Sequence, residues 1–367
     1  MRSLQPHKFY CMNPPKHLRP ALLPSAIAIL LLCVLSFSCE KNNSLLTEAQ
    51  TSASLSKSII VLPFPALLAW VQLANLPFPD GVAGDIPNGL VSPQGFAING
   101  KGYLCGGMTI TSFGLAEELK LLWEYDTATK AWTQKASFPG STPDEGSNFV
   151  IGSSAYVQVG NSNWQYSQPS NTWVQKSNMP GHSRSHATAF AIGQNGYAGL
   201  GFDATTGAGD QGDFYEYESA LDTWVRIAPF PGTQREGAMA FVINSYGYVC
   251  SGMHYESGNP TVYLTDLWQY SAVANAWTKK QTFPANGRSY GVGLSGLGNG
   301  YVGTGSDGSG FYKDFWKYTP SSNTWSSLPD IGSARGEAGS FFIGSNIYVA
   351  GGTAGLDGLK DFWTLHL

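Results

Sequence analysis

Charged residues are scarce in this chain. Only 13% of its 367 residues are Asp, Glu, Lys or Arg, about half the share in an ordinary soluble protein. Long exposed helices need charged and helix-favouring residues on their solvent faces, so the composition disfavours a helical protein. Aromatic residues supply 13% of the chain and hydrophobic residues 43%, which excludes a disordered chain.

Cysteine is also scarce, with five residues in the whole chain. Cys11 and Cys33 belong to an N-terminal segment that we expect to be removed, and Cys39 directly follows it. Cys105 and Cys250 occupy equivalent places in two distant repeats. Equivalent positions in separate repeats do not meet, so we expect two buried strand thiols and no disulfide framework.

No segment after residue 37 is apolar enough to cross a membrane, and the one such run before it lies between Ala21 and Phe37. Basic residues and no acid precede this run, and the small residue Ser38 ends the segment. A basic start, an apolar middle and a small residue before the cleavage point describe a signal peptide over residues 1–38. The basic residues are Arg2, Lys8, Lys16 and Arg19.

The signal segment resembles that of a bacterial lipoprotein, because Leu35-Ser-Phe-Ser38 directly precedes Cys39. This resemblance implies that Cys39 is lipidated and becomes the new N-terminus. The alternatives are a plain secretory signal or a single membrane anchor, for which the run has about the minimum length. Met12 is an alternative start to Met1, since the segment before the apolar run is long.

Residues 39–60 are rich in Ser and predict a flexible tether. Removal of residues 1–38 leaves 17 basic residues against 25 acidic ones, a net charge of −8. This charge disfavours nucleic acid and anionic lipid surfaces as partners. The membrane link is therefore expected to be the lipid on Cys39. We expect a lipid-anchored protein of the bacterial cell envelope, at the periplasmic or surface face of the outer membrane.

An aromatic pattern recurs five times, with a Tyr seven positions before a Trp. Another aromatic precedes the Tyr by two positions, so both rings lie on one face of a strand. Turn residues separate the Tyr from the Trp, which predicts a second strand that returns antiparallel to the first. The five pairs are Tyr125 and Trp132, Tyr166 and Trp173, Tyr217 and Trp224, Tyr270 and Trp277, and Tyr318 and Trp325.

A second hairpin precedes each aromatic pair and ends in small residues such as Gly106-Gly107. The complete unit is four short antiparallel strands, repeated about every 50 residues, which is typical of a β-propeller blade. The sequence also resembles the Kelch repeat family from about Ala69 to Leu367, through the Gly pair, the Tyr and the Trp. An Arg before a hydrophobic run completes the match, at Arg184, Arg235, Arg288 and Arg335.

The two ends of this region complement each other. The last unit stops at Leu367 after three strands and lacks its second Trp, whereas Trp70-Val-Gln-Leu73 stands alone before the first unit. We therefore expect an all-β, six-bladed Kelch-type propeller over residues 61–367, closed by an N-terminal strand that completes the last blade. Such closure would remove the open edge of the sheet. The first unit lacks the Arg and has Ser92-Pro93 nearby, and the second has Glu145 instead.

The loops before the innermost strands contain the candidate binding residues. By resemblance to Kelch propellers, these loops border the mouth of the central channel. Four Arg side chains there could hold a carboxylate through forked hydrogen bonds. Alternatively, each Arg bonds loop carbonyls or a neighbouring acid and stabilises the ring. The residue two positions after each Arg varies, which favours a recognition surface. The candidates are Arg184, His186, Arg235, Glu236, Arg288, Tyr290, Arg335 and Glu337.

The sequence contains no compact catalytic motif and no motif for a metal or cofactor. The leading hypothesis is a binding module, not an enzyme, that presents its loop-lined face to a glycan or protein ligand. The chain also resembles the bacterial sialic-acid mutarotases, which are exported six-bladed Kelch propellers. This resemblance implies sugar isomerisation, with Arg235 and Arg335 holding the substrate beside the acid–base residues Glu236 and Glu337. A third hypothesis is a purely structural component of the envelope.

Overall fold

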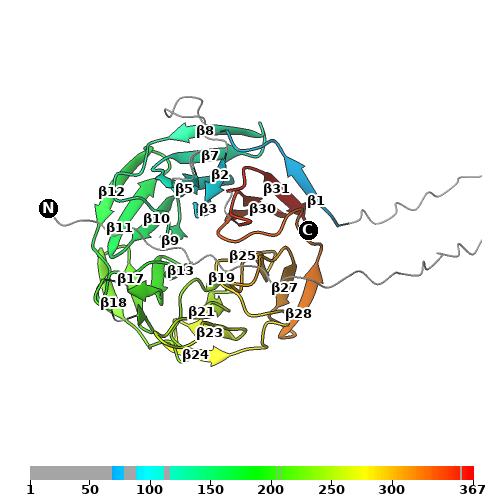
Figure 1. Cartoon of the computed structure of the whole chain (residues 1–367). Coiled ribbons are helices and arrows are strands. Elements are labelled where there is room, and N and C mark those ends of the chain that lie inside the picture. The colour runs from blue at the N-terminus through cyan, green and yellow to red at the C-terminus, as the bar shows by residue number, and fades with distance from the viewer. Residues whose placement is uncertain (1–67, 78–87, 111–115, 204, 208, 356–357) are drawn as a thin grey trace, which may run out of the picture. The chain divides into compact units, whose positions relative to one another are not determined.

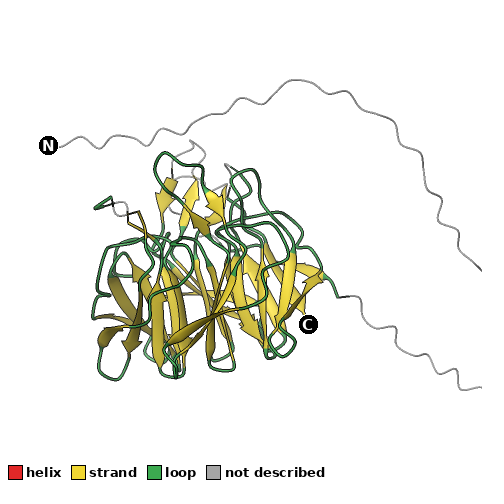
Figure 2. Cartoon of the chain, turned by 90° about the horizontal axis from the view of Figure 1, so that it is seen from below, coloured by secondary structure: helices red, strands yellow, loops and turns green. Residues whose placement is uncertain are grey.

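The computed structural model describes residues 68–77, 88–110, 116–203, 205–207, 209–355 and 358–367. The predicted signal peptide and tether, with Cys39, lie outside these residues. All regular elements in the described part are β-strands, as Figure 2 shows, and this confirms the all-β class. In these ranges we find no helix with the length and apolar character needed to cross a membrane.

Six antiparallel sheets of four strands make up most of the described chain. The first three sheets follow one another in the sequence. The first contains β3 (Gln94–Ile98), β4 (Lys101–Cys105), β7 (Leu122–Asp126) and β8 (Ala131–Lys135). The second contains β9 (Ser147–Ile151), β10 (Ser154–Val159), β11 (Ser162–Ser167) and β12 (Thr172–Lys176). The third contains β13 (Thr188–Ile192), β14 (Asn195–Gly199), β17 (Phe214–Glu218) and β18 (Thr223–Arg226).

The other three sheets have the same strand order, and the last of them draws its fourth strand from the N-terminus. The fourth contains β19 (Met239–Ile243), β20 (Tyr246–Cys250), β23 (Leu267–Ser271) and β24 (Ala276–Lys279). The fifth contains β25 (Val292–Gly296), β26 (Asn299–Gly303), β27 (Phe315–Thr319) and β28 (Thr324–Leu328). The sixth contains β29 (Gly339–Ile343), β30 (Asn346–Ala350), β31 (Phe362–His366) and β1 (Trp70–Leu73).

The first strand of each repeat lies innermost, and these strands form a ring around a central axis (Figure 1). Each innermost strand contacts the innermost strand of the following sheet, in the order β3, β9, β13, β19, β25 and β29. β29 also contacts β3, so the contacts return to their starting point.

The sixth sheet joins the two ends of the described chain. Trp70 of β1 lies opposite Leu365 of β31, and Leu73 lies opposite Phe362. The indole Nε1 of Trp70 donates to the carbonyl of Pro329, just after the outer strand of the fifth sheet, at 2.9 Å. Trp173 makes the same bond to Ala136 after the first sheet, at 2.8 Å. Trp70 therefore fills the role of the repeated Trp in a sheet whose own sequence lacks it.

The predicted Tyr–Trp pattern is confirmed as a set of directly opposed residues on neighbouring antiparallel strands. Tyr125 of β7 faces Trp132 of β8, with 5.0 Å between the ring centroids. The four other pairs have the same register and centroid distances between 4.9 and 5.1 Å. Tilted aromatic pairs at this distance stabilise a sheet beyond the area that they bury.

Short strands project from one end of the ring of sheets, as Figure 2 shows. They are β2 (Asn88–Val91), β5 (Met108–Ile110), β6 (Ala116–Glu118), β15 (Phe202–Asp203), β16 (Gly209–Asp210), β21 (Met253–His254) and β22 (Val262–Tyr263). Single backbone bridges join Ser185 to Phe202 and Glu236 to Met253. These bridges place the projecting hairpins at the same end as the loops that precede the innermost strands.

Cys105 and Cys250 are free and completely buried, as expected for strand thiols. Burial raises the pKa of both thiols well above the ordinary value, so neither is prepared for thiolate chemistry.

Candidate functional site at the channel mouth

Six residues at equivalent positions surround one end of the central channel. Each lies two positions before the first residue of an innermost strand. All six line a cavity of about 480 Å³ on the axis of the ring, a volume in the range of small-molecule sites. We call them the mouth residues: Ser92, Glu145, His186, Gly237, Tyr290 and Glu337.

A chain of backbone hydrogen bonds holds the mouth residues in place. The N–H of His186 donates to the carbonyl of Glu145 at 2.8 Å, and the N–H of Gly237 donates to His186 at 3.1 Å. The chain continues through Tyr290 and Glu337 to Ser92, at 3.0, 2.8 and 2.9 Å. Five of the six residues have a φ between 50° and 60°, the exception being Glu145. This left-handed conformation turns each N–H toward the adjacent sheet, so the main chain itself fixes the rim.

The mouth side chains form two polar contacts and one ring contact. Nδ1 of His186 lies 3.1 Å from a carboxylate oxygen of Glu236. The imidazole also lies 4.6 Å from the ring of Tyr290, measured between centroids. Elsewhere on the rim, the hydroxyl of Ser92 donates to the carboxylate of its neighbour Glu337 at 2.5 Å. An imidazole, a phenol and carboxylates therefore meet in one cavity.

The surroundings shift the proton affinity of two mouth residues. Burial alone would lower the pKa of His186, but the hydrogen bond to Glu236 and the charges of Glu145 and Glu337 outweigh it, so the pKa is raised. Burial raises the pKa of Tyr290 far above its ordinary value, and the nearby Glu236, Glu337 and Glu145 raise it further. The phenol is therefore neutral and can donate a hydrogen bond, whereas the raised pKa of His186 favours its protonated form.

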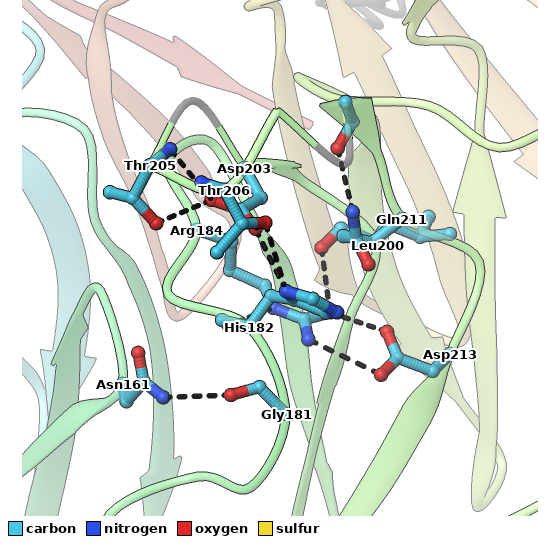
Figure 3. Close-up of polar contacts among 11 residues, drawn as sticks. Asn161, Gly181, His182, Arg184, Leu200, Asp203, Thr205, Thr206, Gln211 and Asp213 are labelled. Atoms are coloured by element: carbon cyan, nitrogen blue, oxygen red, sulfur yellow. Dashed lines mark hydrogen bonds and ion pairs between the residues drawn. The ribbon is translucent and has the colours of Figure 1, made fainter.

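The structure does not place the four Arg side chains at the mouth, where the sequence analysis expected them to bind a ligand. None of them lines the cavity, and each is at most 3% exposed. Figure 3 shows the guanidinium of Arg184 facing the carboxylate of Asp213, with which it makes two bonds of 2.6 and 3.3 Å. The same group donates to the carbonyls of Leu200 and His182. A buried guanidinium with these partners has no free face for a ligand carboxylate.

Arg235, Arg288 and Arg335 repeat this arrangement in their own sheets. Their carboxylate partners are Asp266, Asp314 and Asp361, at shortest distances of 2.5, 2.5 and 2.7 Å. Burial alone would raise the pKa of each carboxyl, but the guanidinium lowers it below its ordinary value. The alternative interpretation of the Arg residues, as groups that stabilise the ring, agrees with this geometry.

The other predicted site residues divide into two groups. His186, Tyr290 and Glu337 lie at the mouth, as the variable position after the Arg predicted. Glu236 is 6% exposed and lies behind His186, where it acts through that imidazole. Sequence reasoning missed Ser92 and Glu145 as mouth residues. It treated them as replacements for the Arg of the other repeats and not as equivalents of the variable residue two positions later. Counting two positions back from each innermost strand would have found both.

Two further His–carboxylate pairs lie in the loops around the projecting hairpins. Nδ1 of His182 lies 2.9 Å from Asp203, whose carboxylate also accepts from Thr205 and Thr206 (Figure 3). These hydroxyl groups lower the pKa of Asp203. His254 pairs with Asp210 at 2.8 Å in the same way. Among the described residues, no group of three or more His, Cys, Asp or Glu side chains is arranged to hold a metal ion.

Comparison with known proteins supports the fold and leaves the ligand open. No protein-family model matches the sequence, and no curated protein matches it. Among solved structures, the protein YjhT is similar, with a TM-score of 0.62 at 15% sequence identity. The similarity covers 76% of this chain and 95% of YjhT. At this identity the likeness shows the fold alone.

Proposed function

We propose that the described chain is a six-bladed Kelch-type propeller, closed by β1, and that its channel mouth binds a sugar. Six sheets of four strands, the pairing of β1 with β31 and the fold shared with YjhT support the architecture. The observation that carries the binding site is the meeting of His186, Tyr290 and Glu337 in one cavity of about 480 Å³. Carboxylates accept from sugar hydroxyl groups, and the phenol donates.

The same residues favour a second candidate function, the interconversion of sugar anomers. In this reaction the anomeric hydroxyl loses a proton, the bond between C1 and the ring oxygen breaks, and the ring oxygen gains a proton. Reclosure reverses these steps on the other face, so no co-reactant is needed. His186, held by Glu236 at 3.1 Å, can supply the proton, and Glu337 can accept one. The mutarotase role proposed for Arg235 and Arg335 does not carry over, because both are buried against Asp.

Two measurements test these functions on the mature protein. Saturation-transfer NMR with a panel of monosaccharides should detect binding, and His186→Ala should abolish it while Arg226→Ala, at an exposed position of β18, should not. Proton NMR of freshly dissolved sugar should show faster anomeric equilibration if the second function is present. Absence of binding to every sugar would reject the carbohydrate site. Sugar binding without faster anomeric equilibration would reject the second function and support a binding module.

We also propose that Cys39 carries a lipid that anchors the propeller to the cell envelope. The motivation is the basic, apolar and small-residue order of residues 1–38 before that cysteine. Cys39→Ala should release the protein from the membrane fraction and prevent incorporation of labelled palmitate. An unchanged membrane fraction in this variant would reject the lipid anchor.

A further inference from the structure

The channel mouth carries negative charge with little to balance it. Besides the mouth residues Glu145 and Glu337, Asp144 lines the cavity, and Glu236 lies directly behind His186. The cavity lining includes no Lys and no Arg. Three carboxylates therefore line the cavity together with His186, whose imidazole is already paired with Glu236.

The four Arg residues near this end are already neutralised. Arg184, Arg235, Arg288 and Arg335 each make two bonds to one Asp, so each pair adds no net charge to the mouth. Among the described residues that line the cavity, His186 is therefore the one side chain that can carry a positive charge.

Several carboxylates at the mouth have capacity left for a ligand. Glu145 is exposed, and no side-chain hydrogen bond or ion pair engages it within the described part of the chain. Glu337 accepts one bond, from Ser92. Asp210 is 4% exposed and lies outside the cavity lining, where it pairs with His254 at 2.8 Å and interacts electrostatically with Glu236.

From this arrangement we propose that the mouth selects sugars that carry a protonated amine and rejects sugars that carry a carboxylate. The proposal rests on the sugar-binding function above and names the charge class of the ligand. An ammonium group would be attracted to Glu145 and Glu337, which line the same cavity as the aromatic ring of Tyr290. A ligand carboxylate would face the same acids without a guanidinium partner, and like charges brought together in a cavity are strongly unfavourable.

The test compares sugars that share a ring and differ in charge. Isothermal titration calorimetry of the mature protein at pH 7 would use glucosamine, glucose and glucuronate, and the matching galactose series. We expect the amino sugar of at least one series to bind about tenfold more tightly than the neutral sugar, and the uronate to bind at least about tenfold more weakly. High salt should weaken the binding of the amino sugar and leave the affinity for the neutral sugar unchanged.

Variants separate this inference from the sugar site itself. Glu145→Gln and Glu337→Gln should each reduce the preference for the amino sugar at least about threefold. Glu218→Gln in β17, away from the cavity lining, is the control and should leave the preference unchanged. A uronate that binds as tightly as the amino sugar would overturn the charge selection while sugar binding stands. Failure of all six sugars to bind would overturn the proposed function and this inference with it.

Discussion

His186 and Glu236 come from loops of adjacent sheets, and their side chains meet at 3.1 Å at the edge of the channel mouth. Although burial works against the charged imidazole, this contact and the neighbouring acids raise the pKa of His186. NMR titration of the His186 ring should therefore give a midpoint above the ordinary value of about 6.5. Glu236→Gln should lower that midpoint. A wild-type midpoint at or below the ordinary value would contradict the electrostatic description of the mouth.

The raised pKa of His186 also predicts how stability depends on pH. A group whose pKa is higher in the folded protein stabilises it fully below the unfolded pKa and loses this effect as the pH rises through the folded value. The free energy of unfolding should thus contain a component that falls above about pH 6.5. His186→Gln should remove that component, which urea unfolding at a series of pH values would measure. An identical pH profile in both proteins would reject the prediction.

Arg335 should be important for stability and not for ligand contact. Its guanidinium is completely buried and forms paired bonds of 2.7 and 2.8 Å with Asp361. Arg335→Ala leaves a buried carboxylate without its partner, and we expect a loss of about 3–5 kcal/mol in urea unfolding. Arg226→Ala, at an exposed position, should change stability by less than about 0.5 kcal/mol. A stable Arg335→Ala protein that had lost sugar binding would instead restore the original prediction of a ligand-binding Arg.

Lys130 stands at a turn position where the other repeats have a side-chain hydrogen-bond acceptor. At the equivalent turn position four other repeats have Asn or Asp, whose Oδ1 accepts from the repeat's own Tyr and from a backbone N–H of the preceding sheet. The four residues are Asn171, Asp222, Asn275 and Asn323.

The repeat with Lys130 lacks this acceptor, and the buried Nε1 of Trp132 has no partner in the described structure. Lys130 has a φ of 56°, which Asn tolerates well. Lys130→Asn should therefore raise the free energy of unfolding by about 0.5–1.5 kcal/mol, measured in urea. Lys130→Gln is the control, because its longer side chain places the amide oxygen farther from the backbone than in Asn. Equal stability of the two variants would reject the proposed acceptor role.

Asn163 occupies a core position that the other sheets fill with Leu or Phe. It is completely buried, and both atoms of its amide lack a partner within the described residues. Since unsatisfied buried polar groups are costly, Asn163→Leu should stabilise the protein by about 1–3 kcal/mol. Thermal and urea unfolding would measure the gain. Asn148→Leu, where the amide donates to Gln94 at 3.1 Å, is the contrasting variant and should not stabilise. A destabilised Asn163→Leu protein would indicate that the amide has a partner, such as a buried water.

The repeated core was predictable because its signal is local. Seven positions between Tyr125 and Trp132 suffice to place both on facing strands, and the same spacing recurs four times. The position of Trp70 in the last sheet was equally predictable, since the last unit lacks the Trp that the N-terminal segment supplies. These features follow from strand geometry and turn length, which short stretches of sequence determine.

The role of the Arg residues was not predictable from their loops alone. The carboxylate that neutralises Arg335 lies 26 positions later, in Asp361. A signal was nevertheless present, because Asp stands two positions before the first aromatic of the pattern only in the four repeats that have the Arg. The repeats without the Arg have Leu121 and Ser162 at that position. Pairing the two positions across repeats would have assigned the Arg to the scaffold.

The backbone bonds among the mouth residues run in one direction from Ser92 round to Glu145 and leave one junction, between these two residues, without a bond. Because these hydrogen bonds join backbone groups, they do not depend on which side chain stands at each mouth position. Ser, His, Gly, Tyr and Glu already occupy the same left-handed position in this one chain. A substitution at the rim can therefore change what the mouth recognises while the backbone links between the sheets stay in place, and related chains can acquire new ligands one residue at a time.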